Sequence, residues 1–364
     1  MGAILSDLSQ CVGFKVTTVL YLHILLTAPD NLACARTNLP ELSKHSYDLH
    51  IEQLRSRIQE CRRERKNCWP NGKSDPMLPS RVIDVGALQE GIFPKLYQTQ
   101  ETERGRYTAL SYCWGGDQSK TTLANFSNMK KKIEDGSLAK TIHDAIEVTR
   151  KLDIRYLWVD AICIIQDDEA DRVKEIKMMC DIYKNATLAI LASTSNRAQD
   201  GFLPTNETKG IRLPFYLSDG SLEPVTVLPC NVTGTPALPL DLRAWALQER
   251  MLVQRRAIFG HNEIGWQCTE LQTTSLGSSL CQSKWKFPEL PPLHELYSYQ
   301  GKWSQLNVWG DIVCEYSQRM LTDHLDRLPA ISGVIQHLES YWSETCMAGL
   351  WRKIFFISYI GLRL

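Results

Sequence analysis

Residues 154–193 constrain the fold more than any other stretch, because their hydrophobic period changes twice. Residues 156–162 form a short apolar run, β-branched and aromatic, which predicts a strand covered on both faces. Residues 187–192 predict a second strand. Between them, apolar side chains recur at three- and four-residue steps, as in an amphipathic helix, at Val173, Ile176, Cys180 and Tyr183, with Met179 and Ile182 widening the stripe. Strand, helix and strand in this order predict a βαβ unit and hence a parallel sheet.

The flanking sequence predicts further elements, and with them an α/β fold in three parts. Strands are expected at 81–85, 95–99, 106–112, 225–228, 257–259 and 264–268, and helices at 50–65, 243–252, 309–321 and 329–342. Ser137 is expected to cap one more helix, while 194–240 and 269–292 are otherwise typical of loops. The breaker-rich segment 69–79 separates an N-terminal helical extension, 1–69, from a central domain, 78–268, and a mainly helical C-terminal region follows at 269–364.

Charge and cysteine usage narrow the functional classes. The 41 Lys and Arg residues balance the 41 Asp and Glu residues, so bulk charge directs the chain toward neither nucleic acid nor an anionic membrane. The twelve cysteines are scattered, which is not typical of a disulfide framework and favours a reduced, cytoplasmic protein. Cys61 and Cys68 are the only close pair, and no histidine or second cysteine pair completes a zinc pattern, so we expect no metal site.

The N-terminal stretch 16–28 is apolar but short for a membrane span, and His23 interrupts it. A signal peptide and N-myristoylation at Gly2 are alternative interpretations of this end of the chain. The thiol-rich body favours the cytosol over secretion. We therefore expect a buried or partner-docking helix here, in preference to membrane contact through residues 1–28.

Polar residues gather where the predicted parallel strands end. Ligands of open parallel sheets bind beyond the carboxyl ends of the strands. Asp160 and Gln166 follow one strand, while Ser111, Trp114 and Gly115 end or follow another. Glycine permits close backbone approach to a ligand, and tryptophan can stack on a flat ring. The same residues also fit a simple turn, a core aromatic and a solvated acidic loop.

Four blocks of sequence resemble the heterokaryon-incompatibility (HET) domain proteins of filamentous fungi. They stand in the order of the family at 107–115 (YTALSYCWG), 156–166 (YLWVDAICIIQ), 179–192 (MCDIYKNATLAILA) and 243–250 (RAWALQER). The central domain is thus identified as a HET domain with its motif core at 106–250. Arg172 departs from the family pattern, which commonly has tryptophan there, and the unmatched end at Leu364 suggests a truncated C-terminal region.

The resemblance implies nonself recognition that triggers the death of fused, genetically different cells. It also implies a flavodoxin-like fold distantly similar to the TIR domain, some members of which cleave the nicotinamide bond of NAD with one glutamate. Partners would be a second copy of the chain or another incompatibility protein, and nucleic acid is not expected. Three hypotheses remain: a signalling and interaction module, an NAD glycohydrolase, and an accessory protein that carries an inactive HET domain.

Glu175 is the candidate catalytic carboxylate under the enzyme hypothesis, with Glu249 as the alternative. No cofactor is then required, and NAD is the substrate. Nicotinamide is a good leaving group, so one carboxylate that stabilises an oxocarbenium-like transition state can suffice. Glu175 flanks the apolar stripe of its helix, where it would be poorly solvated. Structural alternatives are a surface pair of Glu175 with Lys174 or Arg172, and an ion pair of Glu249 with Arg250 that closes the domain.

Overall fold

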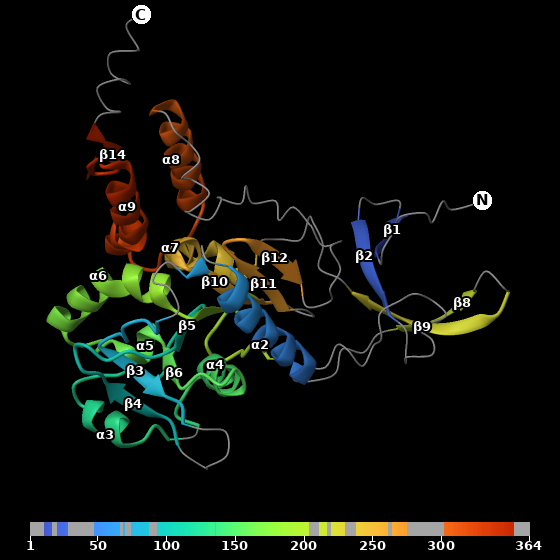
Figure 1. The fold of residues 1–364 in the computed structure, drawn as a ribbon, viewed down its shortest axis with the longest axis horizontal. Coiled ribbons are helices and arrows are strands. Elements are labelled where there is room, and N and C mark those ends of the chain that lie inside the picture. Colours follow the sequence, from blue (N-terminus) through green and yellow to red (C-terminus); the bar gives the residue numbers. More distant parts are fainter. Residues whose placement is uncertain are drawn as a thin grey trace, which may run out of the picture.

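The computed structural model describes residues 11–16, 20–27, 47–65, 68–69, 74–86, 93–134, 136–203, 211–216, 220–229, 238–260, 264–274 and 302–352. The fold is α/β, as predicted, and its centre is an eight-stranded sheet in the order β12-β11-β10-β7-β5-β6-β3-β4 (Figure 1). Its strands are β3 (Arg81–Asp84), β4 (Lys95–Gln98), β5 (Tyr107–Ser111), β6 (Tyr156–Trp158), β7 (Leu188–Ala192), β10 (Arg255–Phe259), β11 (Ile264–Cys268) and β12 (Leu271–Thr274).

The four central strands, β6-β5-β7-β10, are parallel, and antiparallel hairpins extend the sheet on both sides. In chain order the parallel strands are arranged as second, first, third and fourth, which is the flavodoxin-like arrangement. Every residue of β5 and of β7 is buried, because helices cover both faces of the sheet. The predicted parallel sheet is therefore confirmed, although β5 lies between the two strands of the βαβ unit.

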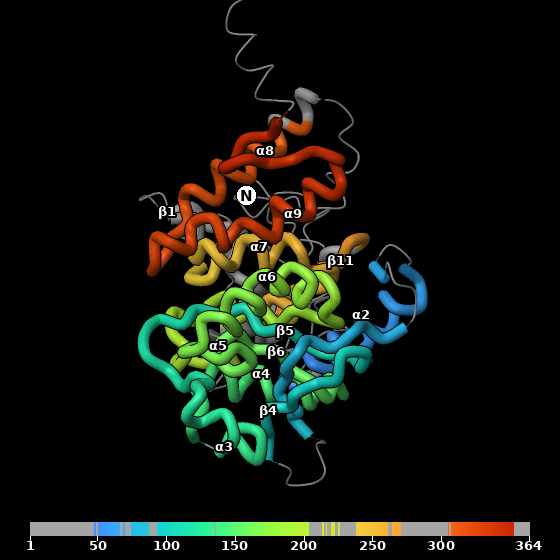
Figure 2. The backbone as a smooth tube through the Cα atoms, turned by 90° about the vertical axis from the view of Figure 1, so that its left-hand side faces the viewer, coloured from blue at the N-terminus to red at the C-terminus, as the bar shows by residue number. Residues whose placement is uncertain are grey.

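Helices occupy both faces of the sheet (Figure 2). One face carries α4 (Lys140–Lys151), and α2 (Tyr47–Glu64) lies beside it, since Arg55 of α2 hydrogen bonds the carbonyl of Lys151. The other face carries α6 (Glu169–Asn185) and α7 (Ala244–Leu252), on which α9 (Pro329–Trp342) packs. The remaining helices are α3 (Phe126–Lys131), α5 (Asp160–Cys163) and α8 (Lys302–Ser317).

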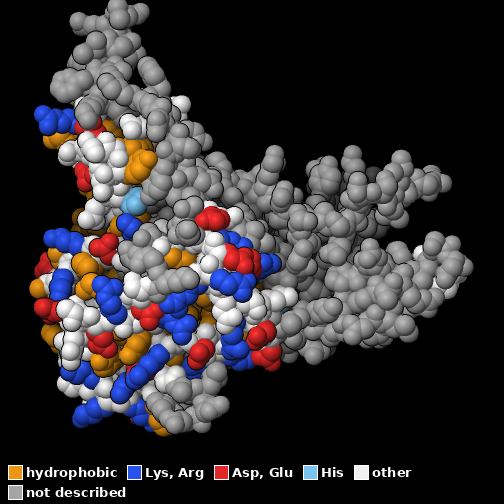
Figure 3. All heavy atoms as spheres, viewed as in Figure 1, with side chains coloured by type: hydrophobic (Ala, Val, Ile, Leu, Met, Phe, Trp, Pro, Cys, Tyr) orange, Lys and Arg blue, Asp and Glu red, His pale blue; other side chains and the backbone are white. Residues whose placement is uncertain are grey.

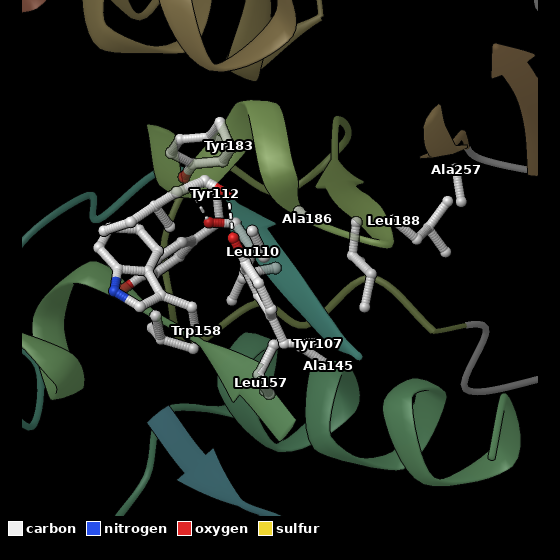
Figure 4. Close-up of a cluster of buried hydrophobic side chains, with 14 of the residues drawn as sticks. Tyr107, Leu110, Tyr112, Ala145, Leu157, Trp158, Tyr183, Ala186, Leu188 and Ala257 are labelled. Atoms are coloured by element: carbon white, nitrogen blue, oxygen red, sulfur yellow. Dashed lines mark hydrogen bonds between the residues drawn. The ribbon is translucent and has the colours of Figure 1, made fainter. Parts of the chain in front are cut away.

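The core lies between β5, β6 and the helix α6. The indole of Trp158 is fully buried, as expected, and meets the ring of Tyr183 edge to face with centroids 5.6 Å apart (Figure 4). The Tyr183 hydroxyl donates to the Leu110 carbonyl at 2.9 Å, so this aromatic pair fastens α6 to β5. The surface is mixed in charge: on the face shown in Figure 3, basic and acidic side chains of the described residues interleave.

A second, four-stranded sheet has the order β1-β2-β9-β8. Its strands are β1 (Cys11–Val16), β2 (Leu20–Thr27), β8 (Ile211–Tyr216) and β9 (Leu222–Pro229). The helix expected at 16–28 is therefore wrong. The period of a short apolar run does not by itself distinguish a helix from a strand. The β-branched residues of 16–28 favour a strand, and β2 pairs with β9. No helix in the described ranges is long and apolar enough to cross a membrane.

Other local predictions also needed correction. The strand expected at 156–162 ends at Trp158, since the carboxylate of Asp160 accepts from the amide of Ala161 and a short helix starts there. Val173 is 49% exposed, although the periodicity placed it on the buried stripe of α6. Ser137 does not cap α4, whose N-cap is Ala139. Strands β8 and β12 lie in segments where the sequence predicted loops.

The loops that follow β5 and β7 pack directly against each other. These strands are neighbours whose chain connections leave in opposite directions, which is where a flavodoxin-like sheet opens a crevice for a ligand. Here the amide of Ala198 donates to the carbonyl of Trp114 at 3.1 Å. Gly115 has φ +62°, and a Cβ there would lie 2.4 Å from the Asn196 oxygen and 2.5 Å from the Arg197 Cα. Backbone of the two loops therefore fills this position.

We predict that Gly115→Ala destabilises the fold, because the left-handed φ costs about 1–3 kcal/mol for a non-glycine residue and the new methyl group meets fixed backbone. The unfolding midpoint in urea should fall accordingly. Gly310→Ala is the matched control, since Gly310 lies within α8 and nothing stands within 4 Å of its added Cβ. That control should be neutral or more stable, as alanine favours a helix interior. Equal stability of both variants would contradict the close packing at Gly115.

Candidate functional site

Arg243 is the centre of a buried polar cluster at the carboxyl edge of the parallel strands. It precedes α7, and one guanidinium nitrogen donates to the carbonyl of Tyr112, just after β5. Its other terminal nitrogen lies 3.5 Å from the carboxylate of Asp160, at the start of α5. Glu249 of α7 lies 3.9 Å from the guanidinium. Burial alone would lower the pKa of Arg243, but the negative charges of Glu249 and Asp160 outweigh it and raise the pKa.

Glu249 is the most enclosed carboxylate of this cluster. The residue is 1% exposed, and the Ser111 hydroxyl at the end of β5 donates to its Oε2. Its Oε1 accepts no hydrogen bond from any described residue. Burial raises the pKa of Glu249, and the attraction of Arg243 offsets only part of that rise. The arrangement favours a carboxyl group that takes up a proton more readily than an exposed glutamate does.

Two other predicted site residues, Trp114 and Gln166, also join the Arg243 cluster or its rim. The indole nitrogen of Trp114 donates to Asp160 at 2.9 Å, and the ammonium of Lys120 lies 5.5 Å from the ring centroid. The Gln166 amide donates to the Asp160 carbonyl at 3.0 Å. Gly115, by contrast, contributes close backbone packing. The structure thus brings Ser111, Trp114, Asp160, Gln166 and Glu249 to one edge of the sheet, where they bond mainly to one another.

Glu175 lies in a separate buried ion-pair cluster on α6. The residue is 1% exposed, accepts a hydrogen bond from the Ser80 hydroxyl, and lies 3.4 Å from the guanidinium of Arg81. Arg81 also pairs with Asp171 at 2.5 Å and donates to the carbonyl of Cys163 at 2.6 Å. These contacts attach β3 to the start of α6 and to the end of α5. They involve neither Lys174 nor Arg172, which the sequence offered as partners.

Sequence reasoning missed two arginines that organise these clusters. Arg81 stands in a predicted strand, and nothing in the sequence indicated that it would be buried. The residue is 7% exposed. The sequence offers Arg250 as the partner of Glu249, but Arg250 pairs with Asp241 at 3.2 Å and Arg243 takes its place beside Glu249. The available signal was the RAWALQER block itself, because it places a basic and an acidic residue, Arg243 and Glu249, six residues apart in one short segment.

We predict that Glu175→Ala lowers the free energy of unfolding by about 1–3 kcal/mol, since the variant leaves the buried Ser80 hydroxyl and Arg81 guanidinium short of an acceptor. Glu134→Ala is the control, because Glu134 pairs with Lys132 at 2.9 Å on the surface, its side chain 69% exposed. An exposed pair contributes at most about 1 kcal/mol. Chemical denaturation of both variants checks this, and an effect at Glu175 no larger than at Glu134 would contradict the structural role.

A pH-dependent stability difference is expected from Glu249. Its pKa is raised in the folded protein, so the folded state binds a proton there before the unfolded state does. The resulting stabilisation is fully present below the unfolded carboxyl pKa of about 4.5 and is lost as pH rises through the folded pKa. Subtracting the unfolding free energy of Glu249→Gln from that of wild type should therefore give a difference that falls as pH rises. Denaturation at several pH values measures it, and a constant difference would contradict the raised pKa.

Comparison with known proteins agrees with the motifs that surround these clusters. Residues 107–249 match the family model described as heterokaryon incompatibility protein (HET), a span that begins at β5 and ends at Glu249. Heterokaryon incompatibility protein 6, OR allele, of Neurospora crassa is 28% identical over 144 residues. That match covers 35% of this chain and 21% of the Neurospora protein. No solved structure matches the chain. The family match and this relative together support a fungal HET domain at residues 107–249.

Proposed function

We propose that this chain acts in nonself recognition as a cell-death signalling module that works through protein contacts in the cytoplasm. Kinship with a heterokaryon incompatibility protein supports the recognition role. Its partner would be a second copy of the chain or another incompatibility protein. The carboxylates at the sheet edge serve, in this proposal, to hold the domain in the shape that the partner recognises.

Packing at the sheet edge is the observation that carries this proposal. In flavodoxin-like sheets the ligand enters between the loops that follow two neighbouring strands. Those loops contact each other here through Gly115 and the backbone of Asn196 and Arg197. The polar groups below them are bonded to one another, as in the contacts of Trp114 and Arg243 with Asp160. This packing supports a structural role for the edge more strongly than a nucleotide site.

A second candidate function, NAD glycohydrolase activity, gains support from one feature of Glu249. A buried carboxylate oxygen without a hydrogen bond from any described residue is uncommon, and active sites are enriched in carboxyl groups with raised pKa values. The flavodoxin-like strand order is also what kinship with TIR domains would require. Under this alternative Glu249 is a better candidate than Glu175, whose oxygen is engaged by Ser80 and Arg81.

One pair of assays separates the two candidates. The chain is expressed from an inducible promoter in fungal hyphae, with dead compartments counted by a vital dye, and purified protein is incubated with NAD while nicotinamide release is measured. Glu175→Gln and Glu249→Gln keep side-chain volume and should remain folded. We expect both variants to cause death at the wild-type level and no protein to release nicotinamide. Nicotinamide release by wild type, together with loss of death and of release in folded Glu249→Gln, would replace the proposal with the glycohydrolase.

A further inference from the structure

Three cysteines that are scattered in the sequence meet beside β11, the second strand of the central sheet. Cys61 stands in the last turn of α2, Cys68 follows that helix, and Cys268 ends β11. The first two are fully buried and Cys268 is 6% exposed. Their three sulfur atoms all lie within 4.8 Å of one another. Helix α2 and β11 are in contact, so the cluster joins the N-terminal helix to the central sheet (Figure 1).

The spacing of the sulfurs fits coordination of one metal ion. A zinc–sulfur bond of about 2.3 Å in tetrahedral geometry separates two ligand sulfurs by roughly 3.8 Å. Each sulfur–sulfur distance would have to shorten by at most about 1 Å to reach that separation, and small rotations of the cysteine side chains allow this. A disulfide would join only two of the sulfurs at about 2.05 Å and would leave the third as an odd thiol.

A buried arginine beside the cluster points independently to negative charge there. Arg255 is 3% exposed and donates to the carbonyls of Thr187 at 2.7 Å, Ala186 at 2.8 Å, and Cys68. Its guanidinium also lies 3.7 Å from the ring centroid of Trp69. Throughout the part of the chain that the structure describes, no carboxylate forms an ion pair with it. Buried charges are ordinarily paired, so Arg255 requires an anionic group beside it.

Three thiolates around one metal ion would supply that anionic group. Binding of Zn²⁺ to three thiols releases three protons and leaves a complex of net charge −1, while Cu⁺ leaves −2. Metal binding and the buried arginine are thus electrostatically complementary.

We propose that Cys61, Cys68 and Cys268 bind one thiophilic metal ion, Zn²⁺ or Cu⁺, which fastens helix α2 to the central sheet. Thiolate ligands select these two ions among the common metals. No histidine or carboxylate of the described residues joins the three sulfurs, so Cu⁺ would be three-coordinate and Zn²⁺ would take a further ligand of another kind. The expected role is structural, because the sulfurs are buried and lie outside the Arg243 cluster.

Metal content of the full chain tests the proposal. The protein is purified under reducing conditions, offered Zn²⁺ or Cu⁺, dialysed, and measured by inductively coupled plasma mass spectrometry, which also tells the two ions apart. We expect about one ion per wild-type chain. Cys61→Ser and Cys268→Ser each remove a ligand, which should weaken binding by more than the roughly 10- to 100-fold cost of losing an outer partner. Cys180→Ser is the matched control, since this buried thiol lies on α6 and donates to the Gly333 carbonyl.

A spectroscopic measurement on wild type keeps the proposal testable even where a serine variant fails to fold. Co²⁺ is the probe, and binding to three cysteines should produce intense thiolate-to-cobalt charge-transfer absorption. The same ion should raise the unfolding temperature of wild type and of Cys180→Ser, but not that of Cys268→Ser. Bound Co²⁺ without the charge-transfer band, no binding by reduced wild type, or equal metal content in all folded variants would overturn the proposal.

Discussion

The domain depends on one largely enclosed guanidinium, that of Arg243, whose side chain is 20% exposed. Arg243 connects the end of β5, the start of α5 and the body of α7, through Tyr112, Asp160 and Glu249. A buried charge is costly unless its partners are held in place, so each of these three elements is constrained by the others. The family match ends at Glu249, the residue that supplies the last partner of the cluster in chain order.

Two buried glutamates, Glu175 and Glu249, differ in how many of their carboxylate oxygens have hydrogen-bond or ion-pair partners. Glu175 shares Arg81 with Asp171 and accepts a hydrogen bond from the Ser80 hydroxyl, so both a cation and a donor engage its carboxylate. Glu249 shares Arg243 with Asp160, but one of its oxygens has no hydrogen bond within the described structure. The position of Glu175 beside the apolar stripe of its helix made it the candidate in the sequence, whereas the geometry makes Glu249 the more unusual group. Residue type and burial were therefore insufficient to rank these two carboxylates, and their partners decided the order.

Local sequence predicted the central fold well, because β7 is uniformly apolar and α4 has a clear helical period. Among the site residues, the strand-end positions of Trp114 and Asp160 were enough to predict that they meet at one edge. Contacts between distant segments were not predictable in this way. Arg81 meets Glu175, and Cys268 meets Cys61, only after the sheet has been assembled, and no local period carries that information. The prediction of a helix at 16–28 was wrong for the same reason, since pairing with the distant strand β9 decides the conformation of β2.

The pairing of β2 with β9 has a consequence for the order of folding. β9 lies between the third and fourth parallel strands in sequence, so β2 leaves the ribosome long before its partner exists. Closing so long a loop has a high entropic cost unless the intervening chain is already compact. The small sheet should thus assemble late, on a formed central domain, and until then β2 exposes an open backbone edge during synthesis.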